Sequence, residues 1–171
     1  VTWNALADFN GDVTLTITIN DGSGSNVVGT ITLTVTAVND DPVNTVGSAV
    51  TTNEDVAVDI SGNSIADVDD TSLTAVTISS DQSGTISLAG VSGLSMDAGA
   101  NGASTMTFSG TVANINTAIA TLTWTSASNV NANAVITLVS NDGDTTDTDT
   151  IAVTVNAIND PPTLSATSSN P

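Results

Sequence analysis

The sequence contains an internal repeat with a spacing of about 120 residues. The dipeptide Asn39-Asp40 returns as Asn159-Asp160, and Trp3 returns as Trp124. The apolar positions between these anchors also match, and the matched pairs are Leu15 with Ile136, Ile17 with Leu138, Ile31 with Ile151, Leu33 with Val153 and Val35 with Val155. A repeat of this length corresponds to one small domain, so the spacing predicts a tandem array of domains.

The repeat divides the chain into three predicted pieces. Residues 1–39 are the C-terminal part of a preceding repeat, residues 40–159 are a complete repeat, and residues 160–171 are a linker and the start of the next repeat. Residues 1–39 supply only closing strands, which cannot bury their own apolar side chains. We therefore expect either earlier residues of a longer chain or a neighbouring copy, added by its strands, to cover them. The start at "VTW", without Met, also suggests a piece of a longer chain.

Period-two alternation predicts the secondary structure of the repeat. The segments "DVTLTITIN" and "GTITLTVTAV" alternate Thr with Val, Leu or Ile, which indicates strands with one buried and one wet face. Asp21-Gly22 between them, and Asp142-Gly143 in the second copy, are hairpin turn signals. Further short strands are predicted near 46–52, 56–60, 73–79, 85–89 and 104–109. Seven or so short strands in about 120 residues predict an all-β sandwich.

One segment departs from the β pattern. Val112, Ile115, Ile119 and Leu122 follow helical spacing, with Thr111 available as an N-cap, so we expect a short helix at about 112–120. The aromatic residues are few, and we expect each of them to fill a sandwich core rather than to form a sugar-stacking surface; they are Trp3, Phe9, Phe108 and Trp124.

The composition narrows the function classes. The 171 residues include 18 Asp and Glu but no Lys, Arg, His or Cys, for a formal charge of −18. Nucleic acid and anionic membranes need basic side chains, so neither is an expected partner, and no apolar run is long enough to insert into a membrane. Without His, Cys or Lys the usual bases and nucleophiles are missing, so we expect no enzyme activity. Self-repulsion of this size makes a divalent cation the first partner to consider.

Acidic residues gather near the predicted boundary at residue 40. Asp40 and Asp41 are followed by Glu54 and Asp55 and then by the acidic run of residues 67–70, and we expect them to converge where two domains meet. Calcium prefers six to eight oxygen ligands of this kind. Asp and Asn also populate turns and solvated surface, which is the alternative explanation. The segment "DGDTTDTD", residues 142–149, is a second candidate, although it lacks the Gly and Glu of an EF-hand loop.

Several of these motifs resemble one family. "VNDDPV" and "INDPPT" look like the linkers of cadherin-like repeats, "NED" and "DVDD" resemble their acidic motifs, and "GTVANINTAIATLTW" followed by "NDG" resembles the cadherin-like or VCBS-type tandem repeats of large bacterial surface proteins. The resemblance implies Ig-like, cadherin-like Greek-key sandwiches of about 120 residues, each with one short helix. It also implies a calcium ligand set, with the linker role repeated in the second copy: Asn39, Asp40, Asp41, Glu54, Asp67, Asp69, Asn159 and Asp160. Ala37 stands where the first Asp of a cadherin linker is expected.

The expected function is therefore a structural or adhesive repeat of a secreted or cell-surface protein, stiffened by Ca²⁺ at the junctions between repeats. Its partners would be neighbouring repeats or other copies, with surface glycans or proteins bound by regions outside this chain. One alternative is a subunit of a self-assembling extracellular filament, sheath or surface layer, completed by strand addition from neighbouring copies. A third class, a carbohydrate-binding module, has little support because aromatic residues are scarce.

Overall fold

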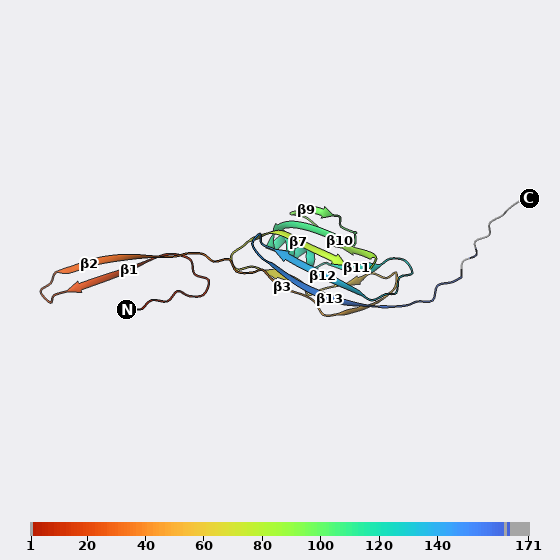
Figure 1. Cartoon of the computed structure of the whole chain (residues 1–171), viewed down its shortest axis with the longest axis horizontal. Helices are drawn as coiled ribbons and strands as arrows, with labels where there is room; N and C mark the ends of the chain where they lie inside the picture. Colours follow the sequence, from red (N-terminus) through yellow and green to blue (C-terminus); the bar gives the residue numbers. More distant parts are fainter. Residues whose placement is uncertain (1, 163, 165–171) are drawn as a thin grey trace, which may run out of the picture. The chain divides into compact units, whose positions relative to one another are not determined.

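The computed structural model describes residues 2–162 and residue 164. The chain forms two compact units, Val1–Asp40 and Asp41–Pro171, called unit 1 and unit 2 below. Both units are built from β-strands, and Figure 1 shows the strands of each in sequence colours.

Unit 1 is built around a β-hairpin. Its strands β1 (Gly11–Asn20) and β2 (Asn26–Val35) pair antiparallel along their full length, as the alternation predicts. The turn is stabilised locally, because the Asp21 carboxylate accepts hydrogen bonds from both the backbone N–H and the hydroxyl of Ser23, at 2.9 and 2.6 Å. These two hydrogen bonds, the hydroxyl's first, lower the pKa of Asp21 from its usual value.

The register of the hairpin separates its two faces by chemistry. Apolar residues lie opposite apolar residues, as in the pairs Val13–Leu33 and Leu15–Ile31, whereas Thr16 lies opposite Thr30. Because successive side chains of a strand point to opposite sides, one face of the hairpin is apolar and the other is mainly Thr.

Unit 2 is an all-β sandwich with one helix among its described residues. Its strands are β3 (Val43–Thr45), β4 (Val50–Asn53), β5 (Val58–Asp59), β6 (Ser64–Ala66), β7 (Ser72–Ser80), β8 (Gly84–Ser87), β9 (Leu94–Gly99), β10 (Thr105–Thr111), β11 (Thr123–Ser126), β12 (Ala134–Asn141) and β13 (Thr146–Asn156). The largest sheet of the described chain has the order β4-β13-β12-β7-β10-β9, and two smaller sheets have the orders β5-β11-β8 and β3-β6. The β13–β4 pair is parallel and the others are antiparallel.

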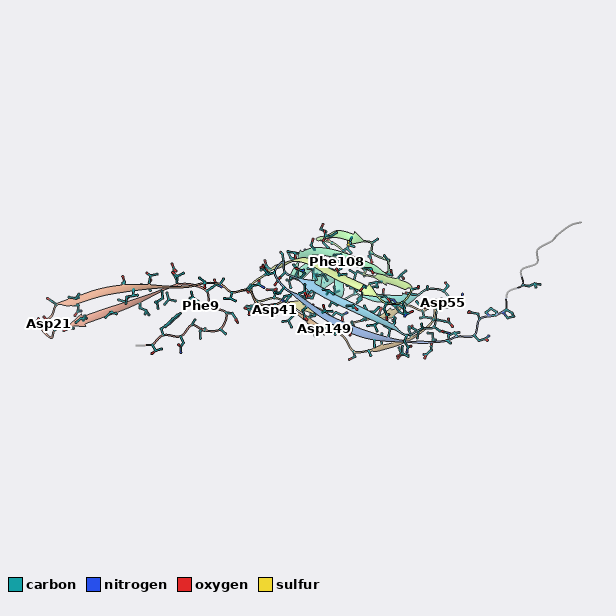
Figure 2. The ribbon with its side chains drawn as sticks, viewed as in Figure 1. Phe9, Asp21, Asp41, Asp55, Phe108 and Asp149 are labelled. Carbon is teal, nitrogen blue, oxygen red and sulfur yellow. The ribbon has the colours of Figure 1, made fainter. Side chains whose placement is uncertain are left out.

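The core of unit 2 lies between the sheets. Phe108 of β10, Ile136 of β12 and Trp124 of β11 are fully buried in one cluster that draws side chains from both larger sheets and the helix. The indole N–H of Trp124 donates to the Ser80 hydroxyl at 3.1 Å, so its one polar group is satisfied. The predicted core positions of Trp124 and Phe108 are confirmed (Figure 2 labels Phe108).

The helix is also where the sequence predicts it. Helix α1 (Val112–Ile119) buries Ile115 and Ile119. Thr111 is its N-cap, and its hydroxyl accepts a hydrogen bond from the Asn114 N–H at 3.2 Å. The apolar spacing and the cap therefore select the helix together.

The two hairpins that the internal repeat relates have the same register. Val13 lies opposite Leu33 in unit 1, and the corresponding residues Ala134 and Val153 lie opposite each other in unit 2. The pairing also ends at matched positions, because Asn20 with Asn26 corresponds to Asn141 with Thr146. The hairpin β1–β2 is thus a second copy of the hairpin β12–β13.

Two aromatic residues do not lie where the sequence predicts. Trp3 and Phe9 are exposed at 38% and 37%, with their rings edge to face at a centroid distance of 6.1 Å. The predicted burial of both is wrong for unit 1, because β1 and β2 are the only strands among its described residues and provide no second sheet. An edge-to-face pair also differs from the flat platform that stacks on a sugar ring.

Candidate metal site

The acidic residues that come closest together belong to two loops of unit 2. Asp67 and Asp70 lie between β6 and β7, and Asp142 lies in the turn between β12 and β13. Each contributes one carboxylate oxygen to a group in which the three oxygens lie within 4.8 Å of one another. The sheet brings the loops together, because β7 and β12 are neighbours and Asn141 lies opposite Ala75. These three residues are called the acidic triad below.

Local hydrogen bonds orient two of the three carboxylates. Asp67 Oδ1 accepts from the backbone N–H groups of Asp69 and Asp70, at 2.9 and 2.8 Å. Asp142 Oδ1 accepts from the backbone N–H groups of Asp144 and Thr145, both at 2.7 Å. Backbone N–H groups thus take the place of the basic side chains that the sequence lacks.

The geometry of the triad suits a calcium ion. Two ligand oxygens on opposite sides of a calcium ion, each about 2.4 Å from it, are about 4.8 Å apart. Asp142 is only 8% exposed, and the second oxygen of Asp67, Oδ2, is buried with no hydrogen-bond partner in the described part of the chain. A buried carboxylate oxygen without a partner is costly, and a bound cation would satisfy it.

The structure divides the predicted ligands between different places. Asp67 belongs to the triad, and Asp69 lies in the same loop with its N–H bound to Asp67. Asp41 begins unit 2, whereas Asn39 and Asp40 belong to unit 1. The amide of Asn39 donates to the Asp40 carbonyl at 3.1 Å, and that of Asn159 to the Asp160 carbonyl at 3.2 Å, so both linkers share one local contact.

Glu54 lies at the other end of unit 2 from the triad, so its expected convergence with Asp67 and Asp69 is wrong. Strand β4 runs parallel to β13, which places Glu54 beyond the C-terminal end of β13, while Asp142 precedes its N-terminal end. The length of β13 separates them by roughly 33 Å. In Figure 2, Asp55, which follows Glu54 in the chain, and Asp41, at the start of unit 2, lie at opposite ends of unit 2.

Glu54 has a structural contact at its own end. Its side chain is buried, and its Oε1 accepts a hydrogen bond from the Ile158 N–H at 2.6 Å. Its backbone N–H also donates to the Asn156 carbonyl at 3.0 Å. These bonds fasten the segment just before Asn159 and Asp160 to the sandwich, so the carboxylate has a role that requires no metal.

The sequence does not identify Asp70 and Asp142 as members of one site. Asp142 belongs to "DGDTTDTD", which lacks the Gly and Glu of an EF-hand loop, and its partners in the triad come from another loop. The available signal is indirect: each of the two acidic loops adjoins a long strand, β7 or β12. Their proximity depends on which strands pair, and local sequence does not determine that.

Comparisons with known proteins give structural likenesses but no match by sequence. No family model matches the sequence, and no curated protein is similar to it. The solved structure of domains 4 and 5 of the S-layer protein SbsC is similar, with a TM-score of 0.39 and 19% sequence identity. The match covers 84% of this chain and 57% of that chain, which is less than two thirds of it.

The described part of the chain has no helix long and apolar enough to span a membrane.

Proposed function

We propose that this chain is a structural repeat of an extracellular or cell-surface protein, in which β-sandwich domains in series give mechanical or adhesive support. The observation that carries the proposal is the register shared by the hairpins β1–β2 and β12–β13. One chain thus builds the same closing hairpin twice, about 120 residues apart. Serial repetition of one domain is how proteins gain length without new folds.

The role is non-catalytic in this proposal. The sequence contains no His, Lys or Cys, which removes the usual general bases and nucleophiles. A domain under tension needs strands that are firmly joined, and unit 2 provides long hydrogen-bonded pairs between β7, β12 and β13.

Stretching tests the mechanical role. A chain with several copies of residues 41–159 in series should unfold in equal steps, each releasing the length of one repeat at about 3.6 Å per residue. Gradual extension without steps would contradict the proposal, because it would show that the repeats do not resist force as separate domains.

The second part of the proposal is structural calcium at the acidic triad. Asp67, Asp70 and Asp142 supply three carboxylate oxygens, and a cation there would join the β6–β7 loop to the β12–β13 turn. The cation would offset the mutual repulsion of three close carboxylates, of the order of 3 kcal/mol per pair at an effective dielectric constant of about 20. The other residues of the implied ligand set stay predictions.

Thermal unfolding with and without calcium tests the cofactor. Added Ca²⁺ should raise the melting temperature relative to EGTA, because an ion present at 100 times its Kd stabilises the folded state by about 2.7 kcal/mol. The double variant Asp67→Asn, Asp142→Asn should lose this gain, since amides keep the local hydrogen bonds but not the charge.

Two controls make the test specific. Asp97→Asn changes an exposed carboxylate on β9 outside the triad and should keep the full calcium effect. Magnesium at the same concentration should give a smaller gain, because it prefers a tighter octahedral site. An equal gain in the double variant and the original chain would assign the effect to general charge screening and remove calcium from the proposal.

A further inference from the structure

The apolar face of the hairpin in unit 1 is left exposed, although its copy in unit 2 is covered. Ile17 is 49% exposed, whereas the corresponding Leu138 is 3% exposed. Ile31 is 48% exposed, and the corresponding Ile151 is 2% exposed. Beside them lies a hollow of ≈ 610 Å³ lined by Trp3, Leu15, Thr16, Ile17, Thr18, Ile31 and Leu33.

Unit 2 shows what covers such a hairpin. Strand β7 pairs with the free edge of β12, from Ser80 opposite Ile136 to Ala75 opposite Asn141. Strand β4 pairs in parallel with the free edge of β13. The apolar face packs against the cluster that contains Ile86, Ile115 and Trp124, from the second sheet and the helix. All of these covering elements precede residue 127.

The hairpin of unit 1 has the same two outer edges and the same uncharged face that are covered in unit 2. In the described part of unit 1, β1 and β2 pair only with each other, so each has one edge without a strand. The apolar face carries Val13, Leu15, Ile17, Ile19, Val27, Gly29, Ile31, Leu33 and Val35, and none of these is charged. A partner as acidic as this chain would therefore meet no carboxylate on that face.

We propose that the hairpin β1–β2 docks into a repeat body, meaning a segment equivalent to residues 41–121 that has neither a counterpart of Trp124 nor a closing hairpin of its own. The partner's equivalent of β7 would pair with β1, and its equivalent of β4 would pair with β2 in parallel. Trp3 would take the place that Trp124 occupies in unit 2. This choice of partner rests on the proposed function of a tandem repeat. It identifies the apolar face of β1–β2 as the surface through which the hairpin joins the rest of its repeat.

A second copy of the whole chain is a poor occupant. Its own repeat body is already filled by β12–β13, so exchange of one hairpin for the other would bury no additional apolar surface. Two hairpins packed face to face would be small as well. A ten-residue pair of strands covers about 33 Å by 10 Å, or roughly 300 Å², against the roughly 800 Å² per partner of a stable interface.

The two tryptophans allow a direct test. Residues 41–121 contain no Trp, so a chain with a copy of residues 41–121 placed before residue 1 keeps only Trp3 and Trp124. In the original chain Trp3 should be quenched by acrylamide while Trp124 stays shielded. In the extended chain both should be shielded, and amide hydrogens of β1 that face away from β2 should become protected from exchange.

Matched variants assign the effect to the apolar face. Leu15→Asp with Ile31→Asp places two carboxylates at a cross-strand pair on that face, and it should leave Trp3 quenchable in the extended chain. Thr14→Asp with Thr32→Asp adds the same charges at the neighbouring pair, on the opposite face and at residues that do not line the hollow, and should keep Trp3 shielded. Both variants lie in unit 1, so shielding of Trp124 reports independently that unit 2 remains folded.

Two results would overturn the proposal. The first is that acrylamide still quenches Trp3 in the extended chain while Trp124 stays shielded. The second is shielding of Trp3 in the original chain that grows with concentration together with the oligomer mass, which would identify a second copy as the occupant. A melting temperature that does not change with calcium would contradict the calcium site but not the docking of the hairpin. The two proposals can therefore fail separately.

Discussion

Asparagine side chains provide many of the connections in unit 2 that charged pairs supply in other proteins. The Asn116 amide donates to the Ile65 carbonyl at 2.8 Å and accepts from the Ile65 N–H at 2.7 Å, which joins α1 to β6. Asn101 forms the same pair of hydrogen bonds with Leu88, both at 2.8 Å. The sequence has no Lys, Arg or His, and an amide can donate and accept through separate atoms, which lets one Asn bind both backbone groups of another residue.

Replacing Asn116 by Ala should therefore destabilise unit 2. We expect a loss of about 1–3 kcal/mol in the free energy of unfolding, because both backbone groups of Ile65 lose a partner. Helix propensity alone predicts the opposite sign, since Ala is the better helix former. Urea unfolding measures the difference, with Asn131→Ala in an exposed loop as the control. Equal stability of the two variants would show that the Asn116 contact contributes nothing.

At the scale of the element, helix α1 is a short helix that depends on its first turn. It spans only Val112–Ile119, which is too short to be stable in isolation. Thr111→Ala removes the hydroxyl that accepts from the Asn114 N–H and should cost about 0.5–2 kcal/mol. Thr117→Ala is the matched control on the exposed side of the same helix, and it should be neutral or slightly stabilising. Similar losses in both variants would contradict the assigned cap.

The elements that sequence predicts well are those with a long repeating pattern or a cap. The strands β1, β2, β7 and β10 and helix α1 lie where periodicity places them, because the apolar side chains of each recur at the period of one face. The sequence pattern does not predict strands β3, β6 and β9. Strand β6 has three residues, Ser64–Ala66, and it exists because Val43 lies opposite Ala66 and Asn116 holds Ile65.

The same distinction applies to the acidic triad. Asp67 stands in an acidic run that can be recognised from the sequence, whereas Asp142 joins it only because β7 and β12 are neighbours. The sequence places Glu54 at the same site because it follows the acidic pair at the predicted boundary and because "NED" resembles an acidic motif of cadherin-like repeats. Proximity in sequence misled because the chain between Glu54 and Asp67 passes from one end of unit 2 to the other.

At the scale of the whole molecule, the negative charge is not balanced by any basic side chain. Eighteen acidic groups and no basic side chain give a formal charge of −18, so folding brings like charges together with no opposite charge nearby. Three of these groups meet in the triad, and others such as Asp147, whose Oδ2 accepts from the Asn44 N–H at 2.7 Å, are held by backbone donors. Stability must therefore depend on the ions in the solvent.

Sodium chloride should accordingly stabilise unit 2 even when calcium is removed. The Debye length falls from about 30 Å at 0.01 M to about 3 Å at 1 M, which screens repulsion between carboxylates on separate loops. The urea midpoint in EGTA should rise with salt while the slope m stays constant, because the surface exposed on unfolding is unchanged. Trp3→Phe leaves Trp124 as the single reporter and lies in unit 1, outside the domain measured.

The salt dependence also separates two kinds of electrostatic effect. Screening acts on all the carboxylates, so the double variant Asp67→Asn, Asp142→Asn should keep most of its response to sodium chloride while it loses its response to calcium. A midpoint that does not move between 0.01 and 1 M would contradict general repulsion. The whole cation requirement would then belong to the triad, because Asp67, Asp70 and Asp142 are the carboxylates that the fold brings within 4.8 Å of one another among its described residues.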